Sequence, residues 1–260
     1  MAGVDFPRRR RGLRVAVIVG LLIVVALIAA DRIGLLIAQR TVASQVRTQM
    51  ASEGITIDGN PSVHIHGFPF LTQVISGHYS QVDISVQDPS NRGVRLDKLD
   101  VTATDVSAST SSLISGNGRI DAKTVVGTGS LSWASFSQLV DLSGVKQYGI
   151  DPKSIKLGST DSGHVSIQAP VSLLGQTFTI QATGTITANR GILHVGVSNV
   201  TASDSNLPAA FTPKLSGIAR ALSFDVRIPQ LPYRMALNRV QANQAGVAIT
   251  ASAHDVVLGG

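Results

Sequence analysis

The chain lacks cysteine altogether and has few aromatic residues. None of its 260 residues is Cys, and Phe, Trp and Tyr together make up 4%. Without thiols there can be no disulfide, no cysteine nucleophile, no thiolate metal site and no cysteine to carry a lipid anchor. Ser, Thr, Val, Ala and Gly are abundant instead, and that balance favours many strands over a helical bundle.

The folded part of the chain also has little excess charge of either sign. Of the 22 basic residues, five arginines lie in residues 1–14, which leaves 17 basic against 15 acidic side chains in the rest. The pI of about 10.1 therefore reflects a basic leader more than a basic domain. Nucleic-acid binding needs Lys and Arg clustered on the folded part, so we expect no nucleic-acid partner.

The leader is followed by an uncharged apolar run, Val15 to Ala30. These 16 residues are short for a membrane span, but with Leu13 before and residues 33–38 after, a tilted helix reaches across the hydrocarbon. Residues 1–14 are then a basic cytoplasmic leader, residues 15–31 a transmembrane anchor or a signal peptide cleaved after Ile28-Ala29-Ala30, and residues 32–260 an extracytoplasmic domain. Both interpretations predict export to the cell membrane or envelope.

Residues 33–52 show the spacing of an amphipathic helix, with apolar residues on one stripe and Gly54 where the helix ends. This helix is predicted to continue from the membrane segment and to serve as the spine of the domain.

After Gly54 the pattern changes to an alternation of apolar and polar residues that is typical of antiparallel strands. The segments with this alternation are 82–86, 94–103, 120–126, 155–157, 165–173, 178–188, 193–197, 224–228 and 247–253. Residues 178–188 and 193–197 read as a hairpin across Asn189-Arg190-Gly191. Short helices are predicted at 69–76, from the capping Ser132 to about Leu142, and at 213–222.

The stretch Val63 to Gly77 is the densest local signal outside the N-terminus. Strand alternation at 63–66 stops at Gly67, and apolar residues then recur at helical spacing up to Gly77, a predicted C-cap. A strand therefore leads through a sharp turn into a helix of about two turns. The apolar residues of this turn and helix form a predicted wedge: Phe68, Pro69, Phe70, Leu71, Val74 and Ile75.

No motif for catalysis or for a cofactor is recognisable. His64 and His66 share a predicted strand face and could supply half of a zinc site, but no second cluster offers further ligands. We interpret them as two polar residues on the solvated face of a half-buried strand. Gly127-Thr128-Gly129 lacks the third glycine of a dinucleotide site and is interpreted as a twist or bulge. We therefore expect a protein that is not an enzyme and that holds neither a metal nor a cofactor.

The remaining candidate for a functional surface is the apolar face of a long sheet whose other face is polar. Either the sheet leaves a concave apolar groove that binds lipid chains, or it curls on itself and fills its own core. The pattern alone leaves both open.

The arginine leader, the apolar segment and the motif V-x-I-x-G-F-P-F-L-T-Q at Val63–Gln73, followed by G-x-Y at Gly77–Tyr79, resemble the actinobacterial LmeA-like phospholipid-binding family. Ile228-Pro229-Gln230-Leu231-Pro232-Tyr233 is similar to that family's late I-P-x-L-P element. The resemblance implies an α+β fold in which an elongated curved antiparallel sheet wraps around a long helix, as in tubular lipid-binding (TULIP-like) domains. It also implies an envelope lipid binder, whose named member is connected with elongation of the lipomannan mannan chain.

The leading hypothesis is a phospholipid-binding envelope protein that holds acyl chains in an apolar groove, with the six wedge residues as its candidate lipid contacts. It would support lipid transport or the assembly of lipid-linked glycans. The alternative is a non-catalytic scaffold, whose sheet edge or Phe68–Phe70 turn docks a membrane glycosyltransferase. A third hypothesis, a hydrolase built from scattered His and Asp residues, has no motif behind it.

Overall fold

The computed structural model describes residues 9–91, 93–109, 111, 119–173, 176–189, 191–202, 214–228, 231 and 234–258, with side chains from residue 18 onward and not at 173, 176 and 258. The first eight residues of the basic leader lie outside the described residues, as does most of the late I-P-x-L-P element.

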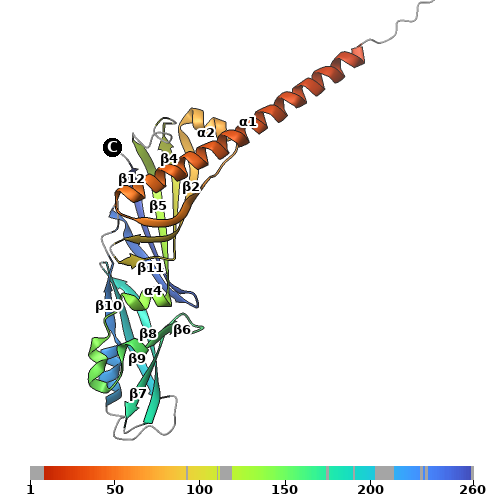
Figure 1. The fold of residues 1–260 in the computed structure, drawn as a ribbon. Helices are drawn as coiled ribbons and strands as arrows, with labels where there is room; N and C mark the ends of the chain where they lie inside the picture. The colour runs from red at the N-terminus through yellow and green to blue at the C-terminus, as the bar shows by residue number, and fades with distance from the viewer. Residues whose placement is uncertain are drawn as a thin grey trace, which may run out of the picture.

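One helix, α1 (Arg9–Ser52), joins the apolar N-terminal run to the folded part without a break. At 1.5 Å per residue its 44 residues extend about 66 Å. Its first half projects beyond the sheets, whereas its second half lies along one of them (Figure 1). In the described part of the chain this is the one helix long and apolar enough to cross a membrane, and only 6% of its most apolar window is buried. The predicted continuation of the apolar segment into the helix at residues 33–52 is confirmed.

The strands form two antiparallel sheets. The first has the order β1-β2-β4-β5-β12-β11, with β3 paired to β2, and the second has the order β10-β9-β8-β7-β6. The first sheet contains β1 (Thr56–Ile65), β2 (His78–Asn91), β3 (Val94–Arg95), β4 (Lys98–Ala108), β5 (Ile120–Ser132), β11 (Ala236–Asn243) and β12 (Gly246–Leu258). The second contains β6 (Lys156–Ser159), β7 (Val165–Leu173), β8 (Gln176–Asn189), β9 (Ile192–Ala202) and β10 (Phe224–Arg227).

Short helices cover the sheets. α2 (Phe70–Ser76) lies beside α1, and α4 (Trp133–Gln138) follows β5 where the two sheets approach each other (Figure 1). The described residues also form the 3-10 helices η1 (Ser143–Tyr148) and η2 (Pro152–Ser154) and the helix α5 (Leu215–Leu222).

The buried apolar residues fall into two clusters. The first core lies between α1, α2 and the first sheet and contains Val63, Ile65, Phe70, Tyr79, Val106, Ala108, Ala122, Val125, Ala253 and Val256. The second core lies on the second sheet under α4, η1 and α5, and it includes Phe136, Val145, Ile167, Ile180, Val195, Ile218 and Leu222. Residues of β11 and β12, such as Ala242 and Val247, also belong to the second core, so the first sheet contributes to both.

The expectation of an N-terminal apolar helix, curved antiparallel sheet and a few short helices is confirmed. The finer expectation of one sheet wrapped around a helix, as in tubular lipid-binding domains, stays a prediction, with a difference in layout: the strands form two sheets, and α1 lies only against the first. Helix α4 ends at Gln138 rather than near Leu142, and α5 begins at Leu215 rather than at Pro213, which lies outside the described residues.

Candidate functional site

The predicted wedge divides into a buried and an exposed part. Phe70 is 5% exposed and packs in the first core, with its ring centroid 6.4 Å from that of Tyr79. Val74 is half-buried against the same core. Phe68, Leu71 and Ile75 are exposed, by 59%, 37% and 85%. Pro69 is exposed as well. The wedge therefore fills the core with Phe70, packs Val74 at its edge and presents the other four residues to the outside.

Helix α2 is held on α1 by contacts at one turn of the long helix. The Leu71 N–H donates to Asp31 Oδ1 over 2.8 Å, and Asp31 is buried. A Cβ placed on Gly34 would lie 3.8 Å from the side chains of both Phe70 and Leu71. Because Gly34 has no side chain, α2 can approach the backbone of α1 closely at this point.

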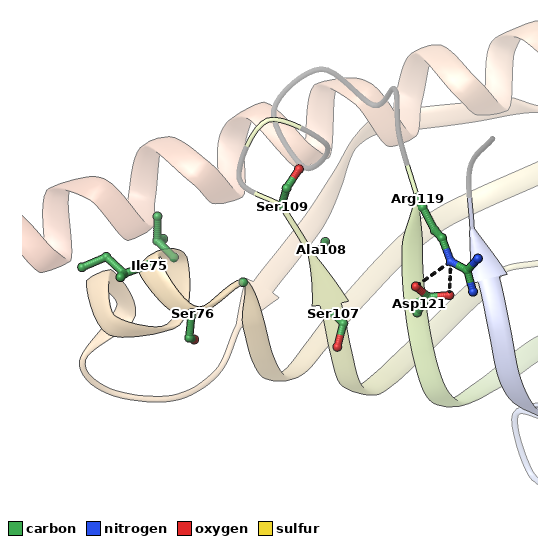
Figure 2. A pocket seen from close by; sticks show the side chains of 9 residues that line it. Ile75, Ser76, Ser107, Ala108, Ser109, Arg119 and Asp121 are labelled. Atoms are coloured by element: carbon green, nitrogen blue, oxygen red, sulfur yellow. Dashed lines mark hydrogen bonds and ion pairs between the residues drawn. The ribbon is translucent and has the colours of Figure 1, made fainter.

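A pocket of about 560 Å³ opens between α2 and the ends of β4 and β5 (Figure 2). Val74 and Ile75 form its apolar side, and Ser107 and Ser109 belong to its polar side. Arg119 Nε donates to both carboxylate oxygens of Asp121 at 2.8 Å, and this bonding raises the pKa of Arg119 above its usual value. The pocket thus combines apolar walls with a charged pair, and both kinds of surface occur in a phospholipid.

A second apolar surface lies on the inner face of the first sheet, between the two cores. We call it the seam. It consists of two rows of directly paired residues that run across five strands: Ile84, Val101, Gly127, Ala251 and Leu237, then Val86, Leu99, Gly129, Ile249 and Val240. Most of these side chains are only half-buried, and Leu99 belongs to neither core.

The two glycines leave room on this face of the sheet for the side chains of neighbouring residues. A Cβ on Gly127 would lie 3.4 Å from Met235 Cε, and one on Gly129 would lie 3.3 Å from Leu96 Cδ1. The ends of two flexible side chains therefore occupy the space above the glycines, and Met side chains adapt readily to other neighbours. Strand pairing continues through Gly127 and Gly129 on both sides, so the interpretation of these glycines as a bulge is wrong.

The two histidines lie on the exposed surface, as their alternation predicts. His66 Nε2 is 2.6 Å from Asp83 Oδ2, and His64 Nδ1 is 3.4 Å from Ser62 Oγ. Burial acts to raise the pKa of Asp83, but hydrogen bonds from Gln81, Thr102 and His66 outweigh it and lower that pKa. Within the described ranges, no group of three or more His, Cys, Asp and Glu side chains is placed to hold a metal ion.

The structure thus brings together the residues predicted on α2 and adds two sites that the sequence pattern did not single out. The alternation of apolar and polar residues indicated that the seam strands have one apolar face. The Gly127-Thr128-Gly129 segment was the available signal for the small residues in the middle of the seam. What the pattern lacked was the order of strands, which places Gly129 between Leu99 and Ile249 and Gly127 between Val101 and Ala251.

Comparison with protein families gives one match that covers most of the chain. The family model described as LmeA-like phospholipid-binding matches residues 29–252. The chain belongs to this family, and membership supports binding of phospholipid. No significant match is found among curated proteins or among solved structures.

Proposed function

We propose that the protein is an anchored, extracytoplasmic phospholipid-binding protein, and that it holds acyl chains against the seam. In this role it supports lipid transport or presents lipid to the assembly of lipid-linked glycans, of the lipomannan type in the family's named member. It does so by burial of apolar surface and without catalysis or a cofactor. Residues 32–260 lie on the outer side of the membrane, because the arginine-rich leader stays in the cytoplasm.

The observation that carries the proposal is the half-buried seam that links the two cores. Ile84 and Val101 pack against the first core. Leu237, Val240 and Ile249 pack against the second. Each CH₂ group removed from water contributes about 0.8 kcal/mol, so an acyl chain laid along an apolar strip binds without any specific polar contact. The outer face of the same strands is polar, with Asp83 opposite Thr102 and Asp100 opposite Thr128. An acyl chain is therefore expected to bind to the apolar face of the sheet and not to its polar face.

The test is photo-crosslinking in proteoliposomes that contain the full chain. A phospholipid with a diazirine near the end of its acyl chain is activated, and the modified peptides are mapped by mass spectrometry. We expect adducts on β4, β5 and β12 in addition to those on the membrane part of α1. Replacing Gly129 by Leu puts a branched side chain into the middle of the seam, and we expect it to reduce the sheet adducts while adducts on α1 persist.

Gly144→Leu is the matched control, because Gly144 is exposed and a Cβ there meets no other atom within 4 Å. It should leave the sheet adducts unchanged. Adducts confined to α1 in the parent protein would overturn acyl binding at the seam.

The alternative function, a scaffold for a membrane glycosyltransferase, is favoured by one observation. The ring of Phe68 is 59% exposed in a turn that contains no charged residue. Replacing Phe68 by Ser separates the two functions: loss of a glycosyltransferase partner with unchanged seam adducts supports the scaffold, and unchanged partner binding argues against it.

A further inference from the structure

The exposed large apolar side chains outside α1 are concentrated at one place. Among the described residues there are five of them, and three, Phe68, Leu71 and Ile75, lie within eight positions of one another. The segment from Gly67 to Gly77 contains no charged residue. Isolated apolar residues on a surface need no explanation, but a cluster of this kind marks an interaction site.

The contacts with α1 determine where along this long helix the cluster lies. The Leu71 N–H is bonded to Asp31, and the Gly34 site lies 3.8 Å from Phe70 and Leu71. The guanidinium carbon of Arg32 lies 4.8 Å from the centroid of the Phe68 ring. Helix α2 therefore sits beside the turn of α1 that runs from Asp31 to Gly34.

That turn coincides with the expected outer boundary of the bilayer. A hydrocarbon core of about 30 Å takes about 20 helical residues. Counted from Val15, the first residue after the last arginine of the leader, 20 residues end at Gly34. The exposed face of α1 is apolar on both sides of Gly34, at Ile33 before it and at Leu36 and Ile37 after it.

We propose that the turn and helix from Phe68 to Ile75 embed in the outer surface of the bilayer and form a second membrane contact beside α1. This inference rests on the proposed membrane anchoring of α1. The occupant of the surface is lipid because the cluster is continuous with the membrane-spanning helix and carries no charge. Arg32 fits the same position, since an arginine at a membrane boundary buries its stem and keeps its charge among the headgroups.

Embedding also determines where the pocket opens. Val74 and Ile75 belong to α2 and line the pocket of Figure 2. With α2 at the boundary, the pocket opens at headgroup level, next to the lipids that would enter it. The first sheet then meets the membrane at the end of β4 and β5 where a lipid can pass from the leaflet to the protein.

The absence of cysteine provides a direct test in the full chain, because each introduced cysteine is the unique labelling site. Leu71→Cys and Ile192→Cys are matched in exposure, at 37% and 38%, and Ile192 belongs to the second sheet. Each is labelled with an environment-sensitive fluorophore and reconstituted in vesicles of phosphatidylcholine and phosphatidylglycerol that carry a nitroxide near the top of an acyl chain.

We expect the label at position 71 to shift to the blue and to be quenched by the nitroxide lipid roughly twofold, since interfacial segments sit about 5–10 Å into the boundary. The label at Ile192 should stay in water. Ile75→Cys repeats the measurement at a position that is 85% exposed, where a label disturbs no packing. Ser44→Cys controls for height, because it is exposed on α1 ten residues beyond Gly34, or about 15 Å further along the helix.

Labels at 71 and 75 that remain as accessible to water as those at 44 and 192 would overturn the inference. A failure of this inference can be distinguished from a failure of the proposed function. Labels in water together with acyl adducts on the sheet overturn the embedding alone, whereas embedded labels without sheet adducts overturn binding at the seam alone.

Discussion

At the scale of single residues, the six wedge residues show what periodicity can and cannot predict. Helical spacing at 70–75 correctly predicted α2, and Gly77 adopts the left-handed conformation of a C-cap with φ of 68°. The same spacing could not separate Phe70, which is inside, from Leu71, which is outside. That division depends on α1, which covers only one side of the short helix and lies far away in the sequence.

The two phenylalanines of the wedge should differ sharply in their effect on stability. Phe70→Ala leaves a cavity in the first core, and we expect it to lower the free energy of unfolding by about 3–5 kcal/mol. Phe68→Ala removes an exposed ring and its contact with Arg32, which contributes about 0.5–1 kcal/mol at such sites. Thermal unfolding followed by near-ultraviolet circular dichroism measures both, and equal losses would contradict the division of the wedge.

Asp83 should make stability depend on pH in the acid range. Its pKa is lowered in the folded protein because hydrogen bonds from Gln81, Thr102 and His66 outweigh the effect of burial. A carboxyl group with a lowered folded pKa contributes stability above its unfolded value, about 3.9, and loses it as the pH falls through the folded value. Asp83→Asn should therefore flatten the fall in stability below about pH 4, by a small amount because the side chain is partly exposed.

The measurement is the unfolding midpoint of parent and variant at pH values from about 5 down to 3. Midpoints that fall in parallel would show that Asp83 makes no contribution to the pH dependence.

At the scale of elements, the sequence predicted those strands and helices whose signals are local and regular. The hairpin of β8 and β9 and the Ser132 cap of α4, whose side chain accepts from the Ser135 N–H, are confirmed. Strand β11 was missed because its register shifts between Leu237 and Arg239, which breaks the alternation. Most of β1 was missed because Gly59-Asn60-Pro61 reads as a turn, and its pairing is irregular there.

The packing of α2 on α1 should depend on the absence of a side chain at Gly34. Gly34→Leu places a branched side chain where Phe70 and Leu71 now lie, and we expect it to displace α2 and to increase proteolytic cleavage between Gly67 and Gly77. Gly34→Ala should be tolerated, because a Cβ would sit at an ordinary contact distance of 3.8 Å.

The matched control is Gly20→Leu, in the same helix, where a Cβ meets no other atom within 4 Å. It should leave the cleavage pattern of the parent. Unchanged cleavage in Gly34→Leu would mean that α2 is held on the sheet without α1.

At the scale of the whole molecule, the seam follows from strand order, which no local pattern encodes. Gly127 and Gly129 face Val101 and Leu99 on β4, about 30 residues away, and Ala251 and Ile249 on β12, more than 100 residues away. The alternation of apolar and polar residues could predict a sheet with one apolar face, but not that this sheet contributes to two separate cores. Because the same strands enter both cores, a ligand held in the seam should stabilise the two halves together.

Phospholipid should therefore raise the thermal midpoint of the full chain held in a detergent-free polymer. Ligand at 100 times its dissociation constant adds about 2.7 kcal/mol. At roughly 2–4 °C per kcal/mol for a chain of this size, the midpoint should rise by about 5–10 °C. Gly127→Leu fills the seam beside Met235, and we expect the variant to fold but to lose most of this rise, since Leu is the better strand former. Gly144→Leu should retain the rise, and an equal rise in the parent and in Gly127→Leu would place the lipid elsewhere on the molecule.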